Sequence, residues 1–150
     1  MSIDAFPELY ARPLFAFGTL QDADVFAIIS GGLSINSVVR EDAWMADHSV
    51  RSVLGGLYPI LQRDSGARAP GTLLFDLPAA VIDRLVQFEH PEFVLVAVEI
   101  ATAKRVFPGA CFWPSDVPPA SEELWSLDRW RIEKKAEWIQ QALRWSNECS

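Results

Sequence analysis

A glycine turn near the start of the chain and one glutamate farther along are the residues best suited to carry chemistry. Residues 13–17 form an apolar run that leads into Gly18, Thr19 and Leu20, which indicates a strand ending in a turn. Glu89 lies far downstream, between the apolar residues Phe88 and Phe93. The pairing predicts a backbone-lined pocket that holds one carboxylate.

Each half of this pair has a chemical rationale. Glycine permits close approach of the backbone to a ligand, and adjacent N–H groups in a turn stabilise a carboxylate or a developing oxyanion. Apolar neighbours raise the pKa of a carboxylate such as Glu89 toward the range useful for proton transfer. The structural alternative is that the turn only connects two elements and that Glu89 is a solvated charge at a helix end.

Glu89 is expected at the C-terminal end of a helix. Pro78 suits a first helical turn, and the apolar residues that follow it recur at helical spacing up to Phe88. Pro91 prevents the helix from continuing. A strand over residues 93–101 and its antiparallel neighbour over 104–113 are predicted next, joined by a turn at 103–104.

The segment between the turn and this helix is predicted to contain a short helix and three strands. Asp22 and Asp24 precede a helix over residues 25–29. Strands are expected over 33–39 and 44–53, separated by the polar residues 40–42. Residues 55–59 are a loop signal, and a further strand over 71–76 is expected after the turn-forming residues 64–66.

The C-terminal segment is expected to be one long helix. Ser121, followed by two glutamates, indicates a capped start, and the helix is predicted to end near Ser146. Trp130, Trp138 and Trp145 share one broad face, and a second apolar stripe contains Ile132, Ile139 and Leu143. These faces predict a wide surface buried against the sheet or against a second subunit. A ligand cage is the alternative use of the tryptophans, and packing is favoured over it.

Composition limits the partners and the compartment. The chain has 150 residues, half of them hydrophobic, which fits one domain over 1–150. Its net charge of -7 and the absence of a basic stripe argue against nucleic acid or an anionic membrane as partner. No apolar stretch approaches the roughly 20 residues of a membrane span, so the cytoplasm is the expected compartment.

Cysteine and histidine give no metal or redox motif. Cys111 and Cys149 are the only cysteines and form no disulfide framework. Cys111 lies in a predicted strand and is interpreted as a buried structural thiol rather than a nucleophile. His48 and His90 lack the close spacing of metal ligands, so no metal site is expected.

Taken in order, the motifs resemble the gamma-glutamylcyclotransferase-like superfamily, including its AIG2-like and gamma-glutamylamine cyclotransferase branches. The resemblance spans roughly residues 14–113: the family's Tyr-Gly-Thr-Leu turn is matched by 17–20, its Tyr-Pro segment by Tyr58 and Pro59, its Gly-rich strand by 71–75, and its helix-end Glu by 85–93.

The resemblance implies a fold, a reaction and a set of site residues. The fold is α+β, a mixed, barrel-like β-sheet flanked by helices. The implied reaction is attack of a substrate's α-amine on its own γ-carbonyl, which closes 5-oxoproline and releases an amine without a cofactor. Glu89 is implied as the general acid and base. The implied substrate-binding residues are Phe17, Gly18, Thr19, Leu20, Tyr58 and Phe93.

The chain departs from the family pattern at three polar positions. Phe17 replaces the usual Tyr, His90 replaces the Gly after the glutamate, and Phe93 replaces a second Tyr. An Arg often found near the start of the following strand is also missing. The pocket is therefore expected to be less polar than in the family, and His90 is a candidate second proton carrier beside Glu89.

Three hypotheses follow. The first is an enzyme that acts on a small γ-glutamyl amine or amide, with Glu89 as acid and base. The second is a module that binds a small molecule in the same pocket without chemistry. The third is an interaction protein whose Trp-rich C-terminal helix contacts a partner or forms a homodimer.

Overall fold

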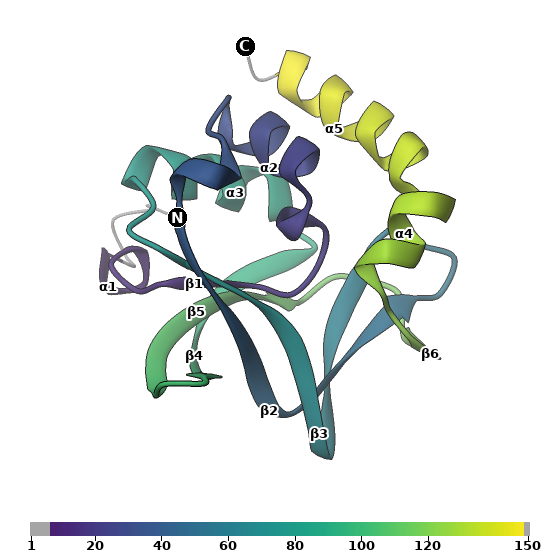
Figure 1. Ribbon diagram of the computed structural model, residues 1–150. Helices are drawn as coiled ribbons and strands as arrows, with labels where there is room; N and C mark the ends of the chain where they lie inside the picture. The colour runs from purple at the N-terminus through teal and green to yellow at the C-terminus, as the bar shows by residue number, and fades with distance from the viewer. Residues whose placement is uncertain (1–6, 149–150) are drawn as a thin grey trace.

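The architecture is a small mixed β-barrel with helices packed over one end. The computed structural model describes residues 7–148 (Figure 1). Five strands pair in a closed ring in the order β3-β1-β5-β4-β2-β3, and β6 extends the sheet beside β2. β1 and β5 are parallel and the other pairs are antiparallel. The strands are β1 (Leu14–Ala16), β2 (Val39–Val53), β3 (Pro59–Phe75), β4 (Phe93–Thr102), β5 (Val106–Pro114) and β6 (Ala120–Leu124).

The helices gather at the end of the barrel where β1 leaves it. In Figure 1, α2 and α3 lie over this end, and α5 runs alongside α2. The helices are α1 (Pro7–Tyr10), α2 (Ala23–Ser30), α3 (Ala79–Glu89), α4 (Leu127–Glu133) and α5 (Lys135–Glu148), with 3-10 turns η2 (Thr19–Gln21) and η3 (Ile35–Ser37). The predicted α+β class with a mixed, barrel-like sheet is confirmed.

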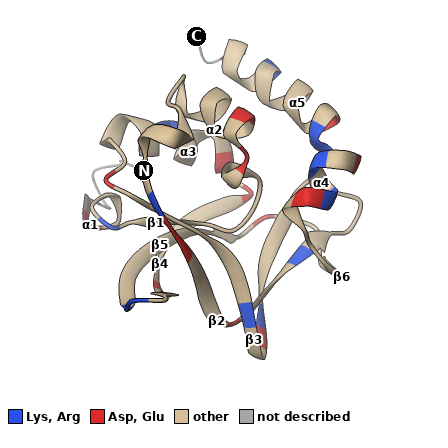
Figure 2. Cartoon of the chain, in the orientation of Figure 1, with Lys and Arg blue, Asp and Glu red and all other residues tan. Residues whose placement is uncertain are grey.

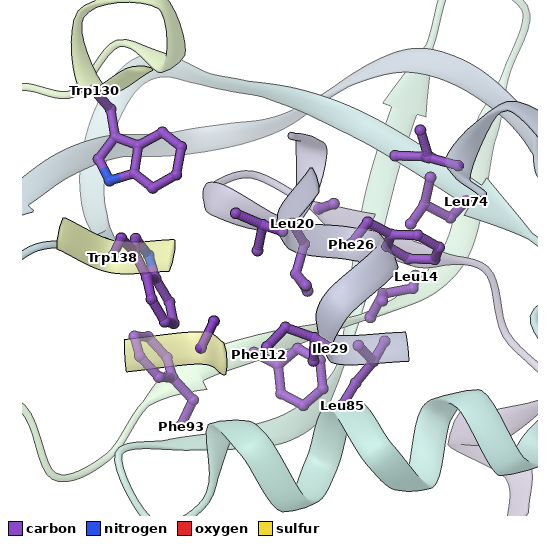
Figure 3. Close-up of a cluster of buried hydrophobic side chains, with 14 of the residues drawn as sticks. Leu14, Leu20, Phe26, Ile29, Leu74, Leu85, Phe93, Phe112, Trp130 and Trp138 are labelled. Atoms are coloured by element: carbon purple, nitrogen blue, oxygen red, sulfur yellow. The ribbon is translucent and has the colours of Figure 1, made fainter. Parts of the chain in front are cut away.

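The hydrophobic core has two parts. One fills the barrel and includes Phe15, Leu73 and Cys111. The other joins the barrel end to the helices, and Figure 3 shows Leu20, Phe26, Leu85 and Trp138 among its members. Trp130 and Trp138 are both buried, so packing accounts for much of their role, as the sequence indicated.

The prediction of two strands separated by residues 40–42 is wrong. Ser34 accepts a hydrogen bond from the Asn36 backbone N–H at 3.2 Å and caps η3, and β2 then runs unbroken from Val39. The polar residues of 40–42 fit inside the strand because Arg40 and Asp42 occupy exposed positions while Ala43 is buried. Alternating exposure, not a break in pairing, explains their polarity.

The turn-forming residues 64–66 also lie inside a strand. β3 is continuous over 17 residues, and its pairing with β2 shifts register here, with residues 64–67 opposite Asp47. Gly66 has a φ of 83° and Asp47 a φ of 60°. The Gly66 N–H donates to the Asp47 carboxylate at 2.9 Å. The turn residues therefore stabilise an irregularity in a long hairpin rather than end its strand.

The C-terminal prediction is corrected in two respects. Residues 120–124 form β6, where the Ser121 hydroxyl accepts from the Glu123 N–H in an extended segment paired with β2. Ser126 is the cap that begins α4, and α4 and α5 are separate helices. The second apolar stripe is not buried throughout, since Ile132 is 86% exposed and Leu143 is 42% exposed.

Candidate active site

A cavity of about 260 Å³ opens where β1 ends, between the barrel, α3 and α5. This volume lies near the lower end of the range for small-molecule sites. Its described lining residues come from five parts of the chain: Phe15, Ala16, Phe17, Gly18, Thr19, Leu20, Leu57, Tyr58, Pro59, Phe88, Glu89, Glu92, Phe93, Phe112, Trp138 and Gln141.

The turn after β1 forms one side of the cavity and requires glycine. A Cβ added to Gly18 would lie 2.9 Å from Cγ of Pro59, closer than nonbonded carbon atoms approach. The Gly18 carbonyl accepts from the backbone N–H of Gln21 and from its side-chain amide, both at 3.2 Å. The Gln21 side chain in turn accepts from Thr72 Oγ1 at 3.1 Å. The turn is thus held against the Tyr-Pro segment and against β3.

A second close approach fixes the strand that leads into the turn. A Cβ on Gly71 would lie 2.6 Å from the Ala16 carbonyl oxygen. β3 pairs with β1 at this point, with Thr72 opposite Ala16. The glycine in β3 therefore lets β1 sit tightly on the sheet before the chain turns.

Glu89 reaches the cavity from the last residue of α3. The helix ends there because the cap residue His90 is extended and Pro91 follows. Burial of the carboxyl raises the pKa of Glu89 to about 8, and the nearby Glu92 carboxylate contributes to the same shift. Glu89 is therefore able to hold or release a proton near neutral pH, which an ordinary glutamate does not do.

Tyr58 and Phe93 form an aromatic wall near Glu89. Their rings meet edge to face with centroids 5.6 Å apart. Burial raises the pKa of Tyr58, and the charges of Glu92, Glu89 and Asp116 act in the same direction. The local potential is accordingly negative, and none of the described residues that line the cavity is Lys or Arg.

All seven residues selected from the sequence line this cavity. The structure adds residues that sequence reasoning missed, chiefly Glu92, Trp138 and Gln141. Glu92 had a weak signal, since it lies three residues after Glu89. Trp138 was a possible ligand-cage residue in the sequence, although packing was favoured. Gln141 had no signal, because the packing of α5 brings it to the site.

Other candidates lie outside the cavity. His90 is exposed and is not among the lining residues. Cys111 is fully buried in the barrel, and burial raises the pKa of its thiol to about 12, which fits a structural role. Cys149 lies outside the described residues.

Residues 7–148 contain neither a metal-ligand cluster nor a membrane-spanning helix. No cluster of His, Cys, Asp or Glu in this range has the arrangement of a metal site. Within the same range no helix is long and apolar enough to span a membrane.

The fold and the turn-plus-glutamate cavity define a class of protein, and the family comparison identifies it. Residues 14–134 match the family model described as "Gamma-glutamyl cyclotransferase, AIG2-like". The chain therefore belongs to the AIG2-like gamma-glutamyl cyclotransferase family. A search of curated proteins returned no match.

Solved structures share the fold at low sequence identity. An Arabidopsis thaliana protein solved in solution is 19% identical, with a TM-score of 0.63 and 87% of each chain covered. A structure titled gamma-glutamyl cyclotransferase is 12% identical, with a TM-score of 0.58, 87% of this chain covered and 85% of that one. A Homo sapiens protein is 13% identical, with a TM-score of 0.59 and coverages of 89% and 98%.

Proposed function

We propose that this protein is a cyclotransferase that converts a small γ-glutamyl amine or amide to 5-oxoproline and a free amine. The observation that carries the proposal is that the 17–20 turn and Glu89 open onto one cavity in a chain of this family. The cavity suits a small molecule, and the net charge of -7 does not suit nucleic acid.

The proposed reaction needs positioning and proton transfer, and no cofactor. The substrate's α-nitrogen attacks its γ-carbonyl carbon, a C–N bond forms, and the bond from that carbon to the leaving nitrogen breaks. The nucleophile is tethered to the electrophile, so a cavity that folds the substrate gains much of the advantage of proximity.

Glu89 is proposed to carry the proton. Its carboxylate accepts a proton from the substrate ammonium, and the resulting acid donates it to the leaving nitrogen as the bond breaks. The attacking nitrogen must lose a second proton to become the lactam N–H, and the regenerated carboxylate takes this proton and passes it to the released amine. With a pKa of about 8, Glu89 accepts a proton from an aliphatic ammonium at little cost in free energy, whereas an ordinary glutamate would be too weak a base.

The turn is proposed to bind the glutamyl head group. The first N–H groups of a helical turn have no partner within the turn, and η2 begins at Thr19, directly after Gly18. We assign these N–H groups to the substrate's α-carboxylate or to the oxyanion that develops on the γ-carbonyl oxygen. The tight contact between Gly18 and Pro59 would keep them in place before substrate arrives.

A second function, binding without turnover, is favoured by the apolar lining. Phe17 and Phe93 stand where the family pattern has tyrosines, so this cavity has lost two hydroxyl groups. A cavity of this kind could hold an amphipathic metabolite and release it unchanged.

One experiment separates the two functions. 5-Oxoproline is measured after incubation with a panel of γ-glutamyl amines and γ-glutamyl dipeptides, using the native protein, Glu89→Gln and the matched control Glu137→Gln. Glu137 is an exposed glutamate on α5 that does not line the cavity. Catalysis predicts turnover by the native protein and the control, with a loss of at least a hundredfold in Glu89→Gln. Binding of a panel member with no 5-oxoproline from any form would favour the second function.

A further inference from the structure

One wall of the cavity comes from a part of the chain that lies beyond the family match. Trp138 and Gln141 line the cavity, and both belong to α5, which begins at Lys135. The family match ends at residue 134. The turn and Glu89 lie inside the matched segment, whereas this wall lies outside it.

Ion pairs hold the start of α5 close to the segment that follows the glycine turn. Asp22, two residues after Leu20, is 1% exposed and caps α2 through the N–H groups of Asp24 and Val25. It also pairs with Arg131 Nε at 2.8 Å and with Lys135 Nζ at 3.0 Å. Figure 2 shows acidic residues on α2 and basic residues where α4 meets α5. The first residue of α5 is thus attached to the element that follows the turn.

The wall itself is aromatic. Trp138 stacks on Phe88 with ring centroids 5.1 Å apart and planes 19° apart, and Phe88 immediately precedes Glu89. Figure 3 shows Trp138 with Phe93 and Phe112, which also line the cavity. Flat aromatic surfaces of this kind favour an aromatic or bulky apolar group over a small polar one.

The charges at the cavity exclude one kind of leaving group. A γ-glutamyl head has one carboxylate, which the proposed function assigns to the N–H groups of the turn. A leaving amino acid would bring a second carboxylate close to Glu89 and Glu92, and no Lys or Arg is present among the described lining residues to neutralise it. An amine that lacks a carboxylate avoids this repulsion.

We propose that the α5 wall, with Trp138 as its main contact and Glu92 as the repelling charge, selects γ-glutamyl derivatives whose leaving group is an aromatic or bulky apolar amine without a carboxylate. This inference rests on the proposed function, because it names the substrate class of the same site. The bond changes are those given above: the α-nitrogen bonds to the γ-carbon, the bond from that carbon to the leaving nitrogen breaks, and Glu89 transfers the two protons lost by the α-nitrogen to the released amine.

The test uses three substrates with the same head group. γ-Glutamylphenethylamide and γ-glutamylphenylalanine differ only in the carboxylate, and γ-glutamylmethylamide lacks the ring. kcat/KM for 5-oxoproline release is measured for the native protein, Trp138→Ala, Trp138→Leu, Trp145→Ala and Glu92→Gln. Trp145 is the matched control, because it also lies on α5 and contacts Phe88 edge to face at 5.0 Å but does not line the cavity. Trp138→Leu keeps an apolar filler if the alanine variant fails to fold.

For the native protein, kcat/KM is expected to be at least tenfold higher for γ-glutamylphenethylamide than for γ-glutamylphenylalanine. Either Trp138 variant should lower the ratio of kcat/KM for γ-glutamylphenethylamide to kcat/KM for γ-glutamylmethylamide about tenfold. Trp145→Ala should change kcat/KM for these two substrates by the same factor. Glu92→Gln should lower the ratio of kcat/KM for γ-glutamylphenethylamide to kcat/KM for γ-glutamylphenylalanine at least threefold. Equal kcat/KM values for phenethylamide and phenylalanine, or a Trp138 effect equal on all three substrates, would overturn the proposal.

A binding measurement distinguishes failure of this inference from failure of the proposed function. Phenethylamine and phenylalanine are each titrated into the Glu89→Gln protein and followed by NMR shifts of the Trp138 indole N–H. Preferential binding of phenethylamine without turnover of any substrate would refute the proposed function and support the subsite. Turnover of all substrates without preferential binding would refute the subsite and leave the proposed function intact.

Discussion

The raised pKa of Glu89 predicts a pH-dependent loss of stability that Glu89→Gln removes. An acid whose pKa is higher in the folded state than in the unfolded state binds more protons when folded. The free energy of unfolding contributed by Glu89 therefore falls as pH rises from about 4.5, the unfolded value, to about 8, the folded value. Above that range the penalty of holding a buried charge is complete.

The size of the effect follows from the two pKa values. A rise from 4.5 to about 8 corresponds to at most about 4 kcal/mol at pH 8. The side chain keeps partial solvent exposure, and water entering the cavity lowers this penalty. We expect Glu89→Gln to be more stable than the native protein by about 2 kcal/mol at pH 8 and equal to it at pH 4, where the native side chain is also neutral.

Urea unfolding at pH 4, 6 and 8 measures this difference, with Glu137→Gln as the control for loss of one negative charge. The control should show no pH-dependent gain, because Glu137 is exposed on α5. A Glu89→Gln curve that stays parallel to the native curve from pH 4 to pH 8 would refute a carboxyl pKa near 8 and remove the basis for its role as a base.

Other predictions test the parts that hold the site. Asp22→Ala should lower the free energy of unfolding by about 3 kcal/mol in urea at pH 7, because two basic side chains lose a buried partner and α2 loses its cap. Gly18→Ala should displace Pro59 and lower kcat/KM at least tenfold, whereas a kcat/KM unchanged from native would contradict a tight turn. Cys111 should resist a thiol reagent at pH 7 until urea unfolds the barrel, and fast labelling of Cys111 itself, located by mass spectrometry of peptides from the native state, would contradict its burial. kcat/KM for 5-oxoproline release should rise with pH up to about 8 as Glu89 ionises, and a flat profile from pH 6 to pH 9 would contradict its role as base.

The sequence was most informative where function and local structure depend on the same residues. The apolar run before Gly18 predicted β1, and the helical pattern between Pro78 and Pro91 predicted α3, which ends at Glu89. These signals are local, because a glycine turn and a proline stop act within a few residues. The resemblance then supplied the barrel, which the spacing of short strands alone did not specify.

The errors came from signals whose meaning depends on distant pairing. Gly66 has the composition of a loop, yet β2 pairs across it and converts the loop into a bulged strand. Ser121 has a cap-like pattern, yet pairing of β6 with β2 keeps it extended and leaves capping to Ser126. In both cases hydrogen bonds to β2 outweigh a preference that the sequence expresses locally.

The sequence offered a ligand cage of tryptophans as an alternative to packing, but it could not place α5 beside the turn and Glu89. Helical periodicity placed Trp138 on an apolar face, but that face both packs on Phe88 and borders the cavity. Only the contact between α5 and α2, anchored by Asp22, brings it there. Residues that tertiary packing brings to a site lie far in sequence from the other site residues, so no spacing pattern connects them.

The central claim is that Glu89 assists an attack within the substrate rather than an attack by water. The most direct measurement is mass spectrometry of the acyl product formed from γ-glutamylphenethylamide in H₂¹⁸O. Attack within the substrate predicts 5-oxoproline without ¹⁸O, released in equal amount with phenethylamine and absent with Glu89→Gln. Glutamate carrying ¹⁸O would show hydrolysis and would refute attack by the substrate's own amine.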